Sequence, residues 1–140
     1  MPRDINSVIV RKVATIDEHR STSEAAILMT EEFIGSVVVT SSSGIAGIFT
    51  ERDLMMKVVG KRKHPEEQKI RDVMTTKLIR VSPKNTPGEC LDLMKEHRCR
   101  HLLVYDDNEF VGIVSLRDIV ALMIEEKEEL IKDLEKYITS

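Results

Sequence analysis

The chain has 140 residues, 24 of them acidic and 21 basic, with a formal net charge of −3 at pH 7 and 41% hydrophobic side chains. This length suits one domain or two very small ones, and the nearly balanced charge argues against a nucleic-acid binder that works through a basic face. No stretch approaches the ~20 apolar residues of a membrane helix. With only two cysteines and no signal-peptide pattern near the amino terminus, the sequence predicts a cytoplasmic protein.

The sequence contains one internal repeat. Shifting the chain by 65 residues, without a gap, aligns residues 5–53 with residues 70–118, and 12 of these 49 positions are identical. The chain is therefore predicted to hold two copies of one unit of about 60 residues. Neither copy is large enough to close a core alone, so we expect the two copies to share one. The expected organisation is a first repeat with its linker at 1–66, a second repeat at 67–124 and a C-terminal helical extension at 125–140.

Each copy begins with a short extended segment followed by a helix. The extended segment is predicted at residues 13–16 and, 65 positions later, at residues 78–81. The helix opens with a capping box at Ser21 in the first copy and at Thr86 in the second, where Pro87 stands at the first helical position. Apolar residues at helical spacing give this helix one buried face.

Two strands and a second helix complete the unit. A continuously apolar strand at residues 37–40 is followed by a polar turn and a second strand at residues 45–49, and the aligned segments of the second copy have the same pattern. The second helix starts near Thr50 or Ser115. Because the two central strands form a hairpin, the order β-α-β-β-α predicts an α+β fold with mixed sheets packed against helices.

Two segments lie outside this unit. Residues 57–69 carry five basic and two acidic side chains with a glycine and a proline, which predicts a linker. Its basic run at residues 61–64 is interpreted as a solvated loop or, alternatively, as a contact for polyphosphate or RNA. The C-terminal helix at residues 116–137 has an apolar stripe, interrupted by Lys127, that predicts contact with a second subunit. The residues of the stripe are Leu116, Val120, Met123, Leu130, Leu134 and Tyr137.

The most informative local pattern is GIFTERD at residues 47–53, which recurs as GIVSLRD at residues 112–118. It places a small hydroxyl residue where a strand turns into a helix, and a carboxylate one turn later. A helix amino terminus with a hydroxyl group suits a phosphate, and a carboxylate can accept both hydrogens of a ribose 2′,3′-diol. The glycine would let a ligand approach the backbone closely. The same residues also form a capping box, which needs no ligand, so both interpretations stay open.

These residues resemble those of a tandem cystathionine β-synthase (CBS) domain pair, also called a Bateman module. The resemblance covers about residues 5–125 and includes both copies of the motif. It implies two repeats related by a pseudo-twofold axis, with two equivalent ligand clefts between them. The ligand of such modules usually contains adenosine: AMP, ADP, ATP or S-adenosylmethionine.

The resemblance also implies roles for individual residues, with the hydroxyl group on the phosphate and the carboxylate on the ribose. The residues implied on the ribose and phosphate side are Ser115, Arg117 and Asp118 in one cleft and Thr50, Arg52 and Asp53 in the other. The residues implied on the adenine side are Val8, Val13, Phe33, Ile34 and Gly35 in the first of these clefts and Val73, Leu78 and Arg98 in the other.

The two clefts are not expected to be equal. The second copy has Arg100 and His101 just before its buried strand, where the first copy has Gly35 and Ser36. CBS modules often hold phosphate with a basic residue at the position of Arg100, which favours the cleft with Asp118. A solvated strand entrance is the alternative interpretation of these basic side chains.

The expected function is a stand-alone regulatory, energy-sensing module that is not an enzyme. It would bind an adenine nucleotide, AMP before ADP or ATP, form a homodimer and transmit occupancy to an unidentified partner protein, without a cofactor or metal. The alternatives are a dimerisation adaptor with empty clefts and a nucleic-acid-binding module that uses the basic linker. A zinc site at His97, Cys99 and His101 lacks a fourth ligand, and no Walker loop or Rossmann fingerprint supports an enzyme.

Overall fold

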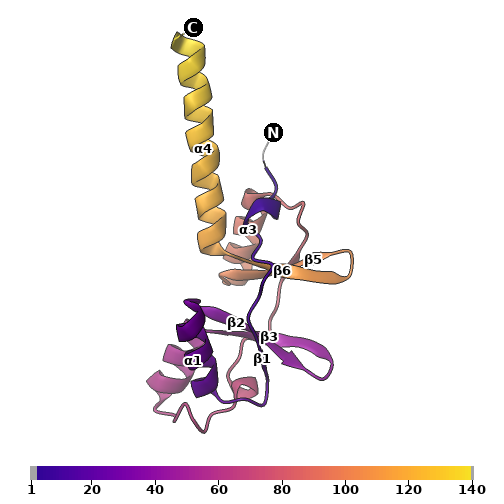
Figure 1. The fold of residues 1–140 in the computed structure, drawn as a ribbon, viewed down its shortest axis with the longest axis vertical. Coiled ribbons are helices and arrows are strands. Elements are labelled where there is room, and N and C mark those ends of the chain that lie inside the picture. Colours follow the sequence, from indigo (N-terminus) through magenta and orange to yellow (C-terminus); the bar gives the residue numbers. More distant parts are fainter. Residues whose placement is uncertain (1–2, 140) are drawn as a thin grey trace. The chain divides into compact units, whose positions relative to one another are not determined.

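The computed structural model describes residues 3–139, which divide into two compact units (Figure 1). The first unit is Val13–Leu78. The second unit consists of residues 79–139 together with the amino-terminal residues 3–12. These limits differ from the predicted repeat boundary after residue 66, because the opening segment of each repeat packs in the unit of the other repeat.

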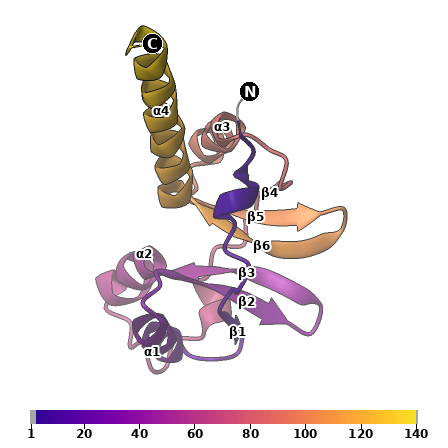
Figure 2. The same cartoon turned by 45° about the horizontal axis from the view of Figure 1, so that its top comes forward.

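The first unit has the predicted order of elements. In chain order they are β1 (Thr15–Asp17), α1 (Thr22–Glu32), β2 (Ser36–Ser41), β3 (Gly44–Thr50) and α2 (Glu51–Asp53), which continues as a π-helical turn at Leu54–Val58. The sheet is mixed, because β1 runs parallel to β2, while β2 and β3 form an antiparallel hairpin (Figure 2). Its register pairs Ser36 with Thr50, so the start of β2 lies beside the start of α2.

The second unit repeats this topology. Its elements are a 3-10 turn at Ile5–Val8, β4 (Arg80–Val81), α3 (Pro87–His97), β5 (His101–Asp106), β6 (Glu109–Ser115) and α4 (Leu116–Thr139). β4 is parallel to β5, and β5 is antiparallel to β6 with His101 opposite Ser115. The predicted α+β class with mixed sheets is therefore confirmed.

The first helix of each repeat starts with a different cap. Thr86 opens α3 with a full capping box: its hydroxyl accepts from the N–H of Glu89 at 3.2 Å, and the Glu89 carboxylate accepts from the N–H of Thr86 at 3.1 Å. The hydrogen bond from the Thr86 N–H, followed by those from the Thr86 hydroxyl and the adjacent asparagine amide, lowers the pKa of Glu89. At α1, Ser21 accepts from the N–H of Glu24, but the Glu24 carboxylate pairs with a neighbouring arginine. The capping box predicted at Ser21 is therefore only half formed.

Each unit has its own hydrophobic core, and each core contains residues from both sequence repeats. Ile5 is fully buried in the second unit among residues of α3, β5 and α4. Ile70, which aligns with it 65 positions later, is fully buried in the first unit among residues of α1, β2 and β3. The prediction of one shared core is therefore wrong. The chain has two cores, and a short segment of the other repeat completes each.

Backbone hydrogen bonds hold the two exchanged segments, which are residues 3–12 in the second unit and residues 67–78 in the first. Val10 exchanges hydrogen bonds with Ile113 at 2.8 and 3.1 Å, and Thr75 does the same with the aligned residue of β3 at 2.9 and 2.8 Å. Each pairing passes close to the motif glycine. A Cβ atom on Gly112 would lie 2.3 Å from the Val10 carbonyl oxygen, and one on Gly47 would lie 2.7 Å from that of Thr75. These glycines make room for the chain itself, which accounts for them without a ligand, and their approach to a ligand stays a prediction.

Part of the predicted linker belongs to the first unit. Val58 is fully buried in its core. The fully buried Thr22 donates its hydroxyl to the carbonyl oxygen of Pro65 at 2.8 Å, and its N–H donates to the same segment. The segment around Pro65 therefore packs against the start of α1, whereas the basic residues 61–64 are exposed as expected.

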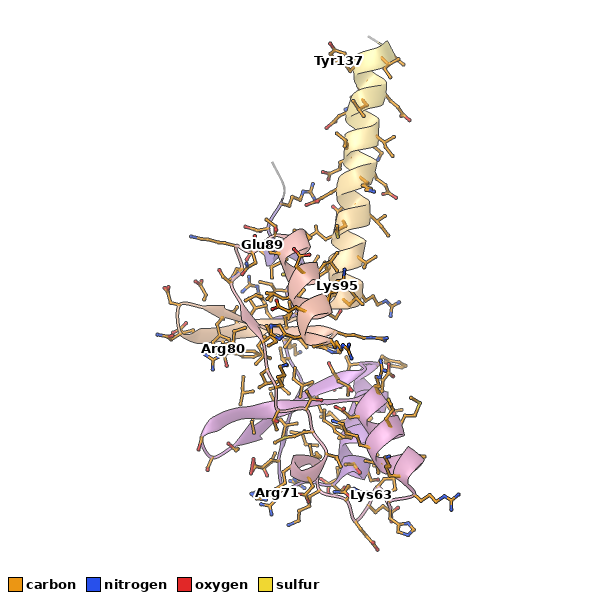
Figure 3. All side chains as sticks on the ribbon, turned by 180° about the vertical axis from the view of Figure 1, so that it is seen from behind. Lys63, Arg71, Arg80, Glu89, Lys95 and Tyr137 are labelled. Carbon is orange, nitrogen blue, oxygen red and sulfur yellow. The ribbon has the colours of Figure 1, made fainter. Side chains whose placement is uncertain are left out.

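The long helix α4 uses its two halves differently. Its first half packs on its own unit, where Leu116 and Met123 contact the core, and its second half runs on past α3 to Tyr137 (Figure 3). Two residues of the predicted stripe, Leu116 and Met123, therefore pack within their own unit. The exposed apolar residues of α4 are Val120, Ile124, Leu130, Ile131, Leu134, Tyr137 and Ile138. Within residues 3–139, no helix has both the length and the apolar composition needed to cross a lipid bilayer.

Candidate functional site

The two copies of the motif lie where the last strand of each sheet meets a helix. Thr50 stands between β3 and α2, and Ser115 stands between β6 and α4. In each copy the hydroxyl oxygen accepts from the N–H of the aspartate, and the carboxylate accepts from the N–H of the hydroxyl residue. Both copies are thus capping boxes, as the ligand-free interpretation predicted. A binding role depends on the acceptor capacity that each carboxylate has left.

The Asp53 carboxylate is buried and surrounded by donors of its own unit, its side chain being 9% exposed. Its Oδ1 lies 3.0 Å from Nζ of Lys57, whose ammonium also donates to the Val73 carbonyl at 3.2 Å. The Thr75 hydroxyl donates to the carboxylate, 3.3 Å from Oδ1 and 3.2 Å from Oδ2. Oδ2 also accepts the N–H of Thr50 at 3.1 Å. An ammonium, a hydroxyl and an amide thus satisfy both oxygens.

The Asp118 carboxylate is half-buried and has capacity left. Its Oδ2 accepts from the N–H of Ser115 at 3.0 Å and from the Ser115 hydroxyl at 2.8 Å. Within residues 3–139, no hydrogen bond or ion pair ends on Oδ1. The positions that align with Lys57 and Thr75 hold Leu122 and Val10, whose side chains carry no donor. Asp118 therefore retains one oxygen for a ligand.

The charges at the two helix starts also differ. The first residue of α2 is Glu51, whose Oε1 lies so close to Gly35 that a Cβ atom there would be 3.1 Å away. The first residue of α4 is Leu116, and its N–H donates at 2.8 Å to the carbonyl of the exposed Arg100. The Glu51 carboxylate beside the first helix start disfavours an anion, whereas the uncharged Leu116 at the second does not.

The start of α4 offers fewer free donors than the motif suggests. The N–H groups of Leu116 and Asp118 are already bonded to the Arg100 carbonyl and the Ser115 hydroxyl oxygen. The hydroxyl hydrogen of Ser115 goes to Asp118. A phosphate at this point would therefore depend mainly on the exposed guanidinium groups of Arg100 and Arg117, while Ser115 positions the carboxylate.

The remaining predicted site residues divide between the two units. Those that share the second unit with Ser115 and Asp118 are Val8, Arg98, Arg100, His101 and Arg117. Those that share the first unit with Thr50 and Asp53 are Val13, Phe33, Ile34, Gly35, Arg52, Val73 and Leu78. Val73 is buried in the first core, and Phe33 is 95% exposed. The contribution of residues 33–35 and Val13 to a site at Asp118 stays a prediction, because they belong to the other unit.

Sequence reasoning missed Lys57 and Thr75, which are the partners of Asp53. The signal was present in the gapless alignment of the repeats. At these two positions a side chain with a donor in one copy aligns with an apolar side chain, Leu122 or Val10, in the other. Only the fold shows that both positions lie next to the motif aspartate.

The cysteine and histidine residues form no metal site in the part of the chain that the structure describes: no group of three or more His, Cys, Asp or Glu side chains is placed to hold an ion. Cys90 is fully buried in the second core. Burial, followed by the negative charge of Glu89, raises the pKa of its thiol to about 11. Cys90 is therefore a neutral packing residue at pH 7.

Comparison with known proteins places this arrangement in a family. A CBS domain model matches the chain twice, at residues 3–60 and at residues 70–125. The chain belongs to the CBS domain family. The predicted tandem CBS pair is thereby confirmed, and each of the two Ser/Thr-x-x-Asp motifs lies in one of the two CBS matches.

Relatives of this CBS pair include CBS domain-containing proteins and a larger enzyme. The mitochondrial CBS domain-containing protein CBSX3 of Arabidopsis thaliana is 33% identical over 120 residues, which are 82% of this chain and 58% of that protein. An inosine-5'-monophosphate dehydrogenase of Methanocaldococcus jannaschii is 31% identical over 117 residues, 82% of this chain but 22% of the enzyme. The crystal structure of a CBS-domain-containing protein from Agrobacterium tumefaciens has a TM-score of 0.79 and 31% identity, covering 88% of this chain and 95% of that one. The chain spans less than two thirds of the two curated relatives, and its likeness to the dehydrogenase is confined to the CBS region.

Proposed function

We propose that this CBS pair is a regulatory module that binds an adenine nucleotide at a site built on Asp118, with AMP as the first candidate and ADP or ATP as alternatives. The ribose hydroxyls donate to Oδ1 of Asp118. The phosphate lies against Arg100 and Arg117, near His101, which is paired with Ser115 across the sheet. The module needs no catalytic group, because its output is a change of conformation and not a reaction.

The observation that carries this proposal is the unused Asp118 oxygen beside basic residues. A half-buried carboxylate gains stability from each added donor, and a ribose diol supplies two hydroxyl donors that one carboxylate can accept. The two exposed arginines whose backbones lie at the same helix start, Arg100 and Arg117, carry guanidinium groups that suit the phosphate of the same molecule. The CBS family supports the proposal, because CBS pairs are often regulatory and nucleotide-binding modules.

The helix α4 offers a route from ligand to partner. It is one continuous helix of 24 residues that starts next to Ser115 and Asp118 and ends in the exposed apolar face. A ligand that moves the start of this helix also moves its far end. The nucleotide can shift the helix between two positions only as far as its affinity differs between them. The regulated partner protein binds differently to the two positions of the helix.

The exposed face of α4 is, in this proposal, covered by a second copy of the chain. Alternating steps of four and three residues, the spacing of a coiled-coil seam, connect Val120, Ile124, Lys127, Ile131, Leu134 and Ile138. In this spacing Ile124, Ile131 and Ile138 occupy the a positions of the heptad and Leu134 a d position. Isoleucine at a with leucine at d favours a two-stranded coiled coil. Lys127 lies between Glu126 and Glu128 in the sequence, so the ammonium that one copy brings into the seam meets carboxylates of the other.

The oligomeric state tests this assignment. In sedimentation velocity, Leu134→Glu should convert a dimer into a monomer, because it places a carboxylate in the apolar seam. Lys132→Glu is the matched control, because it changes charge two residues away, on the other side of the helix. A wild-type chain that stays monomeric at micromolar concentration would contradict the homodimer.

A thermal-shift titration with AMP, ADP, ATP and S-adenosylmethionine tests the nucleotide site; the chain has no tryptophan, so the readout is a dye. A ligand at 100 times its dissociation constant stabilises the protein by about 2.7 kcal/mol, which raises the midpoint by roughly 2–6 °C per kcal/mol. Asp118→Asn should abolish the shift, because it removes the charge and one acceptor. Asp53→Asn, the matched change in the first repeat, should leave the shift intact.

Two outcomes would overturn the proposal. If none of the four ligands shifts the midpoint, the exposed face of α4 favours a dimerisation adaptor without a ligand. If Asp118→Asn retains the shift while the unliganded protein is folded, the ligand binds elsewhere.

A further inference from the structure

We propose that Lys57 and Thr75 close the first unit to nucleosides by occupying the carboxylate of Asp53, so that the chain has one ribose site and not two. The inference rests on the proposed function for the nature of the ligand. It assigns a specificity role to two residues outside the shared motif.

Both donors are held in position by the fold. Lys57 follows Asp53 by four residues, so it lies one helical turn further on and on the same face of the helix. Its ammonium lies 3.0 Å from Oδ1 of Asp53 and 3.2 Å from the Val73 carbonyl oxygen. Thr75 is fixed by two backbone hydrogen bonds to Ile48, at 2.8 and 2.9 Å. Its hydroxyl therefore lies against the carboxylate, 3.3 Å from Oδ1 and 3.2 Å from Oδ2.

A ribose diol could bind Asp53 only by displacing these donors. The diol is neutral, so it would replace a charge-assisted hydrogen bond with weaker neutral ones. A hydrogen bond to a charged group changes an equilibrium constant by roughly 10- to 150-fold. Because the Lys57 side chain is 44% exposed and therefore partly screened by water, the lower part of this range applies. Asp53 in the first unit should bind a nucleoside about 10-fold or more weakly than Asp118 in the second.

The second unit is an internal control for this effect. It has the same hairpin, the same capping box and an aligned aspartate, Asp118, but Leu122 stands in the place of Lys57 and Val10 in the place of Thr75. Leu122 is 1% exposed and belongs to the packed interior of its unit. The two units thus differ at the two side chains that supply donors to Asp53.

The experiment gives the first unit the residues that the second unit has at these two positions. The double variant Lys57→Leu/Thr75→Val is titrated with adenosine by isothermal titration calorimetry. Adenosine tests the ribose alone, without a phosphate for Glu51 to repel. We expect one adenosine per wild-type chain and two per variant chain, and adding Asp53→Asn should return the number to one. Lys61→Leu removes the same charge from an exposed loop and should leave the number at one.

The outcomes separate this inference from the proposed function. One site in both the wild type and the double variant overturns the inference and leaves the Asp118 site standing, and two sites in the wild type also overturn it. No site in the wild type, with one Asp53-dependent site in the variant, overturns the proposed function and supports the inference. No binding in either protein overturns both. The single variants Lys57→Leu and Thr75→Val, each expected to tighten binding at Asp53, give the same decision if the double variant does not fold.

Discussion

The two repeats share one topology and one capping motif, but their aspartates have different neighbours. Asp53 is buried against an ammonium and a hydroxyl of its own unit, whereas Asp118 is half-buried and has one oxygen without a hydrogen bond from residues 3–139. The difference arises at two aligned positions outside the motif, 57 and 75. The motif therefore sets the position of the carboxylate. Donor side chains from outside the motif decide how many of its acceptor sites stay open to a ligand.

The largest expected effect concerns the feature in which the repeats are most alike, the exchanged segments. Ile5→Ala and Ile70→Ala should each lower the free energy of unfolding by about 2–5 kcal/mol, because each removes a fully buried side chain and leaves a cavity. Urea denaturation measures both, with the exposed Ser7→Ala as the control. If Ile5→Ala costs no more than Ser7→Ala, residues 3–12 do not complete the second core.

A smaller effect is expected at the two motif glycines. Gly112→Ala should destabilise the protein by about 1–3 kcal/mol, because the new methyl group would press against the Val10 carbonyl at 2.3 Å. Gly47→Ala should cost less, since the corresponding distance to the Thr75 carbonyl is 2.7 Å. Hydrogen exchange at the Val10 amide would show whether the amino-terminal segment is released.

The control for these glycine changes is Gly88→Ala in α3, where the nearest atom would be 4.0 Å away. This change should be neutral or slightly stabilising, because alanine favours a helix over glycine. Equal destabilisation at all three glycines would mean that close chain approach is not the reason for the motif glycine.

The smallest expected effect separates the two helix caps. Thr86→Ala should cost about 0.5–2 kcal/mol at pH 7, and Ser21→Ala should cost less, because the capping box is complete only at Thr86. The pKa of Glu89 is lowered in the folded protein, so its contribution is present above its unfolded pKa and is lost as the pH falls through the folded one. The difference between the variants, followed by thermal unfolding, should therefore shrink in acid. A difference that is constant down to the lowest pH would contradict the role of Glu89.

Much of the fold could be predicted from the sequence because its signals are local. Apolar strand patterns, the polar turn before Gly44 and the caps at Ser21 and Thr86 depend on neighbouring residues, and the repeat supplied each of them twice. The exchange of Ile5 and Ile70 between units could not be predicted, because it is a choice between two equally apolar cores. A single shared core is expected from the sequence because each copy alone is too small to close one.

The candidate site was predictable only in part. The positions of Ser115 and Asp118 follow from the motif, and the basic residue Arg100 follows from the alignment of the repeats. The state of the Asp53 carboxylate does not, because Thr75 reaches it from a segment 22 residues away. Comparing the copies position by position would have flagged the difference, but not its contact with the carboxylate.

The most direct test of the asymmetry is the stoichiometry of AMP binding, measured by isothermal titration calorimetry on the wild type, Asp118→Asn and Asp53→Asn. We expect one AMP per wild-type chain, no binding for Asp118→Asn and one AMP for Asp53→Asn. Two AMP molecules per wild-type chain, or a site that survives Asp118→Asn and disappears in Asp53→Asn, would contradict the asymmetry between the two aspartates.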